Sequence, residues 1–392
     1  MTALRALLSA GTLLSLGACR AEPRPTVLEP PMPTVHTPPG IQAALRISFA
    51  ALPQYATPAF PAHYRALVRA RTNAPVDNPV TDQGALLGRV LFHETQLSRT
   101  NTRSCASCHI QSAGFSDTAR FSLGIDGVSR TGAHSMRLAN SRFFVSGRAF
   151  WDQRAPTLES QALQPIRDAV EMGFDDAHGG IPALVARLGG HLYYRELFAY
   201  AFGDSTVTGD RIARALAQYV RSIVSVDSRF DEGFSRAFNP LLPDSGLGAP
   251  FPTFTDAENR GKSLFQRRIN QGGAGCAECH LPPTFALELD GEGNGLDADE
   301  TRHFKAPSLR NVALDGAFMH DGRFATLEAV VEHYNSGMQP APSLDSRLRN
   351  ADRSPIRLGL SAADKAALVA YLRTLTDEMI TTDPRFSDPF RR

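Results

Sequence analysis

One short pattern, Cys-x-x-Cys-His, occurs twice in this sequence of 392 residues and constrains the fold more than any other feature. The two copies are Cys105-Ala-Ser-Cys108-His109 and Cys276-Ala-Glu-Cys279-His280. A c-type haem needs two thiols that add across its vinyl groups and an imidazole that binds its iron, and this pattern supplies all three within one turn of chain. We therefore predict two covalently bound haem c groups, each attached through the cysteines of one copy, with iron bound by His109 or His280.

Two other uses of paired cysteines fit the pattern less well. Two Cys-x-x-Cys pairs can form a zinc site, but over a hundred residues separate Cys108 from Cys276, far more than in a zinc ribbon. An exported protein can also carry two dithiol redox motifs. Neither use explains why a histidine follows both pairs, so haem attachment is the interpretation we favour.

The segments around the two motifs repeat, which predicts two related halves rather than a solenoid. Gly88-Arg89-Val90-Leu91-Phe92 precedes the first motif, and Gly261-Lys262-Ser263-Leu264-Phe265 precedes the second at nearly the same distance. Each half also closes with an apolar stripe at helical spacing. The stripes are Ile212, Leu216, Tyr219, Val220 and Ile223 after Gly209-Asp210, and Leu368, Val369 and Leu372 after a capping box of Ser361 and Asp364. Convincing alternating strands are absent, so we predict a mostly α fold.

The N-terminus has the features of an export signal and is not expected to belong to the fold. Arg5 precedes an apolar run at residues 6–18 that is too short to span a bilayer. Residues 16–19, Leu-Gly-Ala-Cys, resemble the lipobox of bacterial lipoproteins, which implies cleavage before Cys19 and a lipid on its thiol; a plain signal peptide with a chance cysteine is the alternative. We expect a signal peptide at 1–18, and a lipidated cysteine with a Pro-rich tether at 19–40.

The remaining composition agrees with these assignments. The five cysteines are all used by two haems and one lipid. Because Lys and Arg number 41 and Asp and Glu number 40, the net charge of +1 gives no general attraction to nucleic acid, and we predict no such partner. We expect the protein at the periplasmic face of a bacterial membrane, anchored through Cys19.

Several further motifs resemble, in the same order, those of the bacterial di-haem cytochrome c peroxidase and MauG family. They are Phe150-Trp151-Asp152-Gln153-Arg154-Ala155, Val170-Glu171-Met172-Gly173, Ala306-Pro307-Ser308-Leu309-Arg310-Asn311-Val312 and His320-Asp321-Gly322-Arg323. The resemblance covers nearly all of the mature chain. It implies two cytochrome c-like helical domains that face each other, each wrapped around a covalently bound haem c. We expect the peroxidatic haem domain at 41–245 and the electron-transfer haem domain at 246–392, with the boundary in the Pro/Gly-rich segment 239–253.

The resemblance also implies roles for individual residues. Trp151 matches the tryptophan that lies between the haems and carries charge; alone, it would be read as core packing. Glu171 matches the acid/base group that moves a proton between the two peroxide oxygens, although an isolated glutamate is usually a solvated surface residue. A carboxyl group inside a haem pocket is expected to have a raised pKa. Gln161 and Pro165 match other residues that line that pocket.

The sequence departs from the family pattern at two places. Many family peroxidases hold a histidine over the peroxidatic iron until they are reduced, but residues 110–133 contain no histidine. We therefore expect an open N-terminal haem that reacts with peroxide without prior reduction. His134 stands where relatives have an asparagine that helps to bind Ca²⁺ between the domains. This makes Ca²⁺ doubtful, although backbone carbonyls near Lys305 and Pro307 could still contribute.

Tyr334 is the predicted sixth ligand of the C-terminal haem iron. It lies at the position, counted from Leu327-Glu328, at which family peroxidases have methionine and MauG has tyrosine. His333 should point elsewhere on a helix; Met338 is the other candidate ligand, and a purely structural role for Tyr334 is the remaining alternative. Methionine tends to raise the potential of a haem, whereas the negative charge of a phenolate favours ferric and higher oxidation states.

Three functions are compatible with these motifs. The leading one is reduction of hydrogen peroxide to water with electrons from a small redox protein, such as a c-type cytochrome or a cupredoxin. The second is MauG-like oxidation of a side chain of a protein substrate by peroxide. The third is a non-enzymatic electron carrier, against which the open haem and Glu171 argue.

Overall fold

The first half of the fold is organised by two helices that cross at a glycine. In the computed structural model, which describes residues 36–287, 291–314 and 316–391, α3 (Asp82–His93) packs against α8 (Gly209–Ser222). A Cβ atom on Gly88 would overlap the carbonyl oxygen of Ala215, so only glycine allows the two backbones to approach this closely. The approach also brings the ring centroid of Phe92 within 5.0 Å of that of Tyr219.

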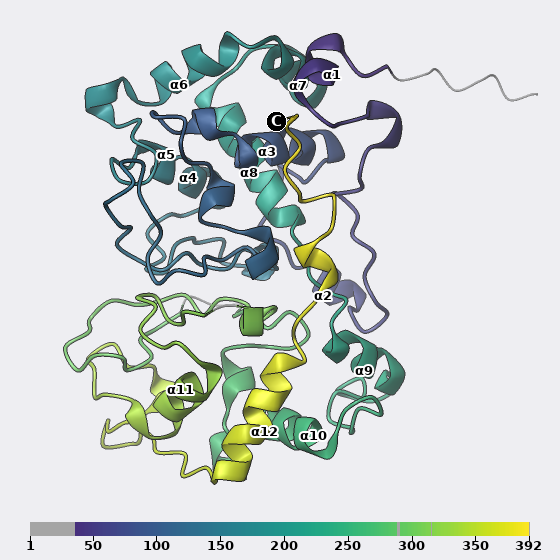
Figure 1. The fold of residues 1–392 in the computed structure, drawn as a ribbon. Helices are drawn as coiled ribbons and strands as arrows, with labels where there is room; N and C mark the ends of the chain where they lie inside the picture. Colours follow the sequence, from purple (N-terminus) through teal and green to yellow (C-terminus); the bar gives the residue numbers. More distant parts are fainter. Residues whose placement is uncertain (1–35, 288–290, 315, 392) are drawn as a thin grey trace, which may run out of the picture. The chain divides into compact units, whose positions relative to one another are not determined.

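The second half repeats this crossing. Helix α10 (Asp256–Gln266) packs against α12 (Ala362–Arg373), and a Cβ atom on Gly261 would overlap the carbonyl oxygen of Ala367. The ring centroids of Phe265 and Tyr371 are 5.2 Å apart. The repeat seen in the sequence is therefore a repeat of structure, and Figure 1 shows the α3–α8 and α10–α12 pairs.

Local sequence accounts for where these helices begin and which face they bury. The side chain of Thr208 accepts a hydrogen bond from the backbone N–H of Arg211 at the start of α8, and Ser361 accepts one from Asp364 at the start of α12. Both predicted stripes face the interior. The side chains buried from them are Ile212, Leu216, Tyr219, Ile223, Leu368, Val369 and Leu372, while Val220 is partly buried.

The other helices of the described residues are shorter or lie around these pairs. They are α1 (Pro39–Ala44), α2 (Ala66–Ala70), α4 (Leu158–Ala162), α5 (Gln164–Arg167), α6 (Gly180–Gly189), α7 (Leu192–Phe202), α9 (Arg229–Ala237) and α11 (Leu327–Glu332), followed by a π-helical turn at His333–Gly337. Within the described ranges, β pairing is limited to isolated bridges. The prediction of a mostly α fold is confirmed. The segment 239–253 joins α9 to α10 and contains no helix, and the division into domains 41–245 and 246–392 stays a prediction.

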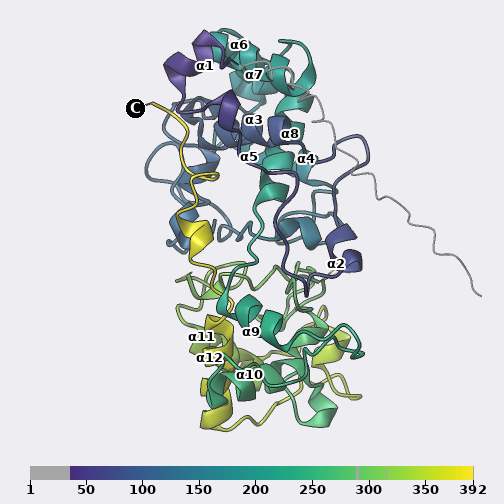
Figure 2. The same cartoon turned by 90° about the vertical axis from the view of Figure 1, so that its right-hand side faces the viewer.

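After α12 the chain returns to the first half and completes it. The main-chain oxygen of Arg385 accepts a hydrogen bond from the hydroxyl of Tyr55 (2.7 Å), and that of Phe386 accepts bonds from His93 Nε2 (2.9 Å) and the Tyr219 hydroxyl (3.2 Å). Phe390 pairs with Leu45 through an antiparallel bridge. Figures 1 and 2 both show the yellow C-terminal segment extending from α12 to the region of α1 and α3.

The predicted signal peptide, Cys19 and most of the 19–40 tether lie outside the described residues. No helix among residues 36–287, 291–314 and 316–391 has the length and apolar character needed to cross a bilayer.

We predict that Gly88→Ala destabilises the protein by about 1–3 kcal/mol, because the added methyl group must push α8 away from α3. The matched control is Gly189→Ala in α6, where a Cβ atom would meet no atom within 4 Å; it should be neutral or stabilising by up to ~1 kcal/mol. Denaturant unfolding followed by circular dichroism measures both. Equal effects of the two changes would contradict the close-crossing argument.

Candidate active site

Both Cys-x-x-Cys-His motifs adopt the same compact turn. The first forms a 3₁₀ turn at Cys105–Ser107 and the second at Cys276–Glu278. In each, the backbone N–H of the histidine donates to the carbonyl oxygen of the first cysteine at 2.9 Å. Burial raises the pKa of the Cys105 and Cys276 thiols to about 12. Each motif therefore places two cysteine side chains on one turn, as thioether attachment requires.

The two motif histidines are oriented in the same way. His109 Nδ1 donates to the carbonyl oxygen of Phe115 at 3.1 Å, and His280 Nδ1 donates to that of Pro307 at 3.1 Å, with Phe285 at 3.4 Å. Burial lowers the pKa of both imidazoles to about 4, which keeps them neutral. A neutral ring that donates from Nδ1 carries its lone pair on Nε2, which is the usual arrangement of a metal-binding histidine.

A backbone feature shared by both loops places these carbonyl groups. Phe115 and Phe285 have positive φ angles of 64° and 55°, and each loop closes with an antiparallel bridge immediately after its phenylalanine. A non-glycine residue in the left-handed region costs free energy and persists where the surroundings hold it. This backbone conformation reverses the direction of each loop, so that a carbonyl oxygen faces the histidine ring.

A cavity surrounds the second motif, and we call it the second-motif cavity. Its lining is mostly apolar and includes Trp151, Cys276, Cys279, His280, Lys305, Met319, Tyr334 and Met338. A mostly apolar cavity that contains two cysteine side chains, a neutral imidazole and several side chains able to bind iron fits a haem c group.

Tyr334, Met338 and Met319 are candidate iron ligands that line this cavity with His280, and the lining also includes His134 and His320. Tyr334 is held by Asn294, whose amide nitrogen lies 3.4 Å from the tyrosine hydroxyl, and burial raises its pKa to about 12. Met338 is buried. Met319 was not singled out from the sequence; its sulfur lies 3.4 Å from the same Asn294 nitrogen. His333 is directed away, because its Nε2 bonds the carbonyl oxygen of Asn294 at 2.9 Å.

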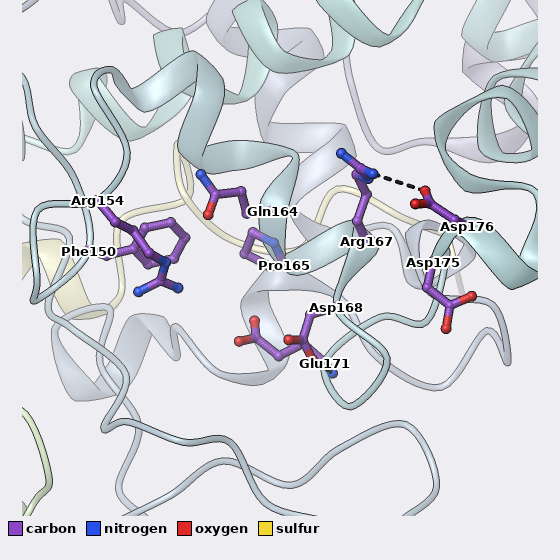
Figure 3. Close-up of a pocket in the computed structure, with 9 residues that line it drawn as sticks. All are labelled: Phe150, Arg154, Gln164, Pro165, Arg167, Asp168, Glu171, Asp175 and Asp176. Carbon is purple, nitrogen blue, oxygen red and sulfur yellow. Dashed lines mark hydrogen bonds and ion pairs between the residues drawn. The ribbon is translucent and has the colours of Figure 1, made fainter.

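Glu171 lies in a separate hollow, the Glu171 hollow, which Figure 3 shows. Its lining consists of Phe150, Arg154, Gln164, Pro165, Arg167, Asp168, Glu171, Asp175 and Asp176. Burial, assisted by the charge of Asp168 and opposed by that of Arg154, raises the pKa of Glu171 to about 7. The charge of Glu171 also acts on the thiols of Cys105 and Cys108, so the carboxyl group is close to the first motif.

Of the two residues predicted to line the pocket around Glu171, only one lines this hollow. Pro165 lines it, as expected. Gln161 lies on the preceding short helix, α4, and the glutamine that lines the hollow is Gln164 on α5. Two glutamines three residues apart cannot be told apart by motif matching alone. The place of Gln161 in catalysis therefore stays a prediction.

Trp151 connects residues from both halves of the chain. Its indole Nε1 donates to the carbonyl oxygen of His134 at 2.7 Å, and its own carbonyl oxygen accepts from the backbone N–H of Lys305 at 2.7 Å. Trp151 lines the second-motif cavity, whereas its neighbour Phe150 lines the Glu171 hollow. One short segment therefore reaches both candidate sites.

The ring of His134 is used for structural hydrogen bonds. Its Nε2 lies 3.2 Å from the hydroxyl of Ser116, and its Nδ1 lies 3.1 Å from the carbonyl oxygen of Arg120. Among the described residues, no group of three or more His, Cys, Asp or Glu side chains is arranged to hold a metal ion. Ca²⁺ coordinated by main-chain oxygens remains a prediction.

The comparisons with known proteins agree with this arrangement. Residues 82–237 match the family described as "Di-haem cytochrome c peroxidase". The chain is 31% identical to "Methylamine utilization protein MauG" of Methylophilus methylotrophus over 315 residues, which cover 77% of this chain and 85% of that protein. The chain belongs to the di-haem cytochrome c peroxidase and MauG family.

Among the other relatives in this di-haem family, some are named as peroxidases and others as MauG or MauG-like proteins. "Cytochrome c551 peroxidase" of Nitrosomonas europaea is 30% identical over 314 residues, which cover 75% of this chain and 80% of that protein. A solved structure of "a MauG-like protein associated with microbial copper homeostasis" superposes with a TM-score of 0.65 and 30% identity, covering 86% of this chain and 98% of that one. Family membership makes the chain a peroxidase-type oxidoreductase with two haem c groups and confirms the predicted cytochrome c-like fold.

We predict that Tyr334→Phe removes the charge-transfer bands of a phenolate bound to iron from the resonance Raman and near-infrared spectra. Met338→Leu and Met319→Leu are the matched controls from the same cavity and should leave those bands in place. A methionine-to-iron band in the wild type that disappears in only one of the methionine variants would show that methionine is the ligand instead.

Proposed function

We propose that this chain reduces hydrogen peroxide to water, using two electrons from a small redox protein and two protons from solvent. One haem c would be attached at Cys105 and Cys108 with His109 as its iron ligand. The other would be attached at Cys276 and Cys279, with His280 and Tyr334 as iron ligands. When bound, the haems supply the iron chemistry that cleaves peroxide and takes up electrons. The c-type cytochrome or cupredoxin that donates them is the expected partner.

The observation that carries this proposal is the environment of Glu171. Peroxide cleavage requires a group that removes a proton from one oxygen and returns it to the other. An acid/base group works best when its pKa is near the working pH, and burial places the pKa of Glu171 at about 7. Because the carboxyl group faces an open hollow beside the first motif, a small peroxide can reach it from solvent.

Trp151 is the proposed electron path between the two sites. Its indole is fixed by the carbonyl oxygen of His134, and its main chain is fixed by Lys305. These two bonds come from opposite halves of the chain and leave the ring little freedom to turn. Electrons entering at the second motif would therefore meet a rigid aromatic group on the way to the first.

MauG-like oxidation of a protein substrate is the second candidate, and Tyr334 favours it. A phenolate ligand stabilises ferric and higher oxidation states, which makes the C-terminal haem a weak electron reservoir. The Tyr334 hydroxyl is present in the second-motif cavity and held by Asn294. If Tyr334 binds iron, oxidation of a protein partner becomes a better supported function than simple removal of peroxide.

We also propose that the protein works at the periplasmic face of the membrane, tethered through Cys19. The apolar run at 6–18, the Leu-Gly-Ala-Cys sequence and the Pro-rich segment after it support this location.

We predict that Glu171→Gln lowers the rate of reaction with peroxide by ~100- to 10,000-fold, the range typical of a positioned acid/base group. The carboxylate form must accept the first proton, so the wild-type rate should rise with pH through about 7 and level off above it. Glu171→Gln should react with peroxide slowly, at a rate that does not depend on pH. Stopped-flow mixing of fully oxidised protein with peroxide measures both.

Asp176→Asn is the matched control for this experiment. Asp176 lines the same hollow but is exposed and paired with Arg167, so its change should leave the rate within about twofold of wild type. Haem content is measured on each variant first. An unchanged rate and pH profile in Glu171→Gln would remove Glu171 from the mechanism.

We predict that Cys19→Ser abolishes incorporation of labelled fatty acid and releases the protein from membranes. The thiol is the attachment point in the proposed lipoprotein, and serine cannot replace it. Fractionation of cells that express either form measures the release. Wild-type protein found wholly in the soluble periplasmic fraction would contradict the anchor.

A further inference from the structure

Lysine is rare in this chain, and the buried lysine Lys262 shows how the fold normally accommodates a buried ammonium group. Lys262 is 2% exposed, and its Nζ lies 4.2 Å from the centre of the Phe251 ring. The same atom donates hydrogen bonds to the carbonyl oxygens of Leu247 and Ala249. These hydrogen bonds to main-chain carbonyl oxygens offset the free-energy cost of burying the Lys262 ammonium group.

Lys305 is buried in a similar way but lacks such acceptors. It is 7% exposed, and its Nζ lies 4.1 Å from the centre of the Phe144 ring. Across the described ranges its ammonium group forms no hydrogen bond and no ion pair; burial alone shifts its pKa, lowering it to about 8. At neutral pH the group therefore remains mostly charged.

The ring contact does not offset this charge. A cation over an aromatic face gains much less free energy than the burial of a charge without a partner costs. Buried charges in proteins are paired or bind a ligand. The missing partner of Lys305 is therefore an anion that the chain itself does not supply.

The surroundings of Lys305 indicate which anion this is. Lys305 lines the second-motif cavity together with two carboxylate residues, Glu292 and Asp345. Asp345 is paired with Arg347, and Glu292 forms no ion pair with Lys305. A haem carries two carboxylate groups, its propionates, in addition to the vinyl groups that the cysteines take.

We propose that Lys305 is an anion-binding residue whose ammonium group holds a propionate of the haem in the second-motif cavity, beside Trp151. The inference rests on the proposed attachment of a haem at Cys276 and Cys279. The backbone N–H of Lys305 already bonds Trp151 (2.7 Å), so one residue links the electron path to the cofactor. Its positive charge favours the reduced state of that haem, because reduction adds a negative charge nearby.

The test compares Lys305→Met, Lys305→Arg and the control Lys262→Met in the holoprotein. Haem content by pyridine haemochrome is measured first, then the midpoint potential of each haem and the propionate bending band in the resonance Raman spectrum. Lys305→Met should lower the potential of the C-terminal haem and shift its propionate band, and Lys305→Arg should largely restore both. Lys262→Met should reduce stability and leave both unchanged.

Two results would overturn the inference directly. One is unchanged spectra and potentials in Lys305→Met, and the other is a change confined to the N-terminal haem. A wild-type potential that moves with added chloride or formate, and stops moving in Lys305→Met, would assign the site to a free anion instead. Wild-type protein without two haems would instead contradict the proposed function.

Discussion

The close crossing of two helices at a glycine is the constraint on which both halves of this protein depend. At Gly88 and at Gly261 the backbone of one helix touches the backbone of the other, and a phenylalanine one turn later meets a tyrosine. The motif turn follows each crossing, so the position of its thiols is fixed by the helices that precede it. Buried apolar side chains of both pairs form the cores of the two halves.

This repeated scaffold carries two sites that differ in chemistry. The first motif lies near a carboxyl group in a hollow lined by charged side chains, whereas the second lies in a mostly apolar cavity. A polar site suits the binding of a small peroxide and the movement of protons. A mostly apolar site suits a haem whose oxidation state is set by nearby ligands and charges. The repeated helix pairs form the common frame of the two halves, and the loops outside these pairs account for the difference between the two sites.

Much of this arrangement could be predicted from the sequence because it depends on local patterns. The doubled motif, the glycine repeat and the apolar stripes of α8 and α12 each describe one segment and its period. What the sequence did not reveal depends on segments far apart in the chain. Met319 enters the second-motif cavity only because its loop folds back onto Asn294, and nothing in the local sequence marks it as a ligand candidate.

The C-terminal return also has a consequence for the order of assembly. The side chains of Tyr55, His93 and Tyr219 donate hydrogen bonds to the main-chain oxygens of residues 385 and 386, and a buried polar group that loses its partner costs about 1–3 kcal/mol. Residues 385 and 386 follow α12 in the sequence, so they are synthesised after both helix pairs. The first half is therefore completed only after the second half has been made, and a chain that stops before residue 385 would leave the first half, with its haem motif, without these bonds.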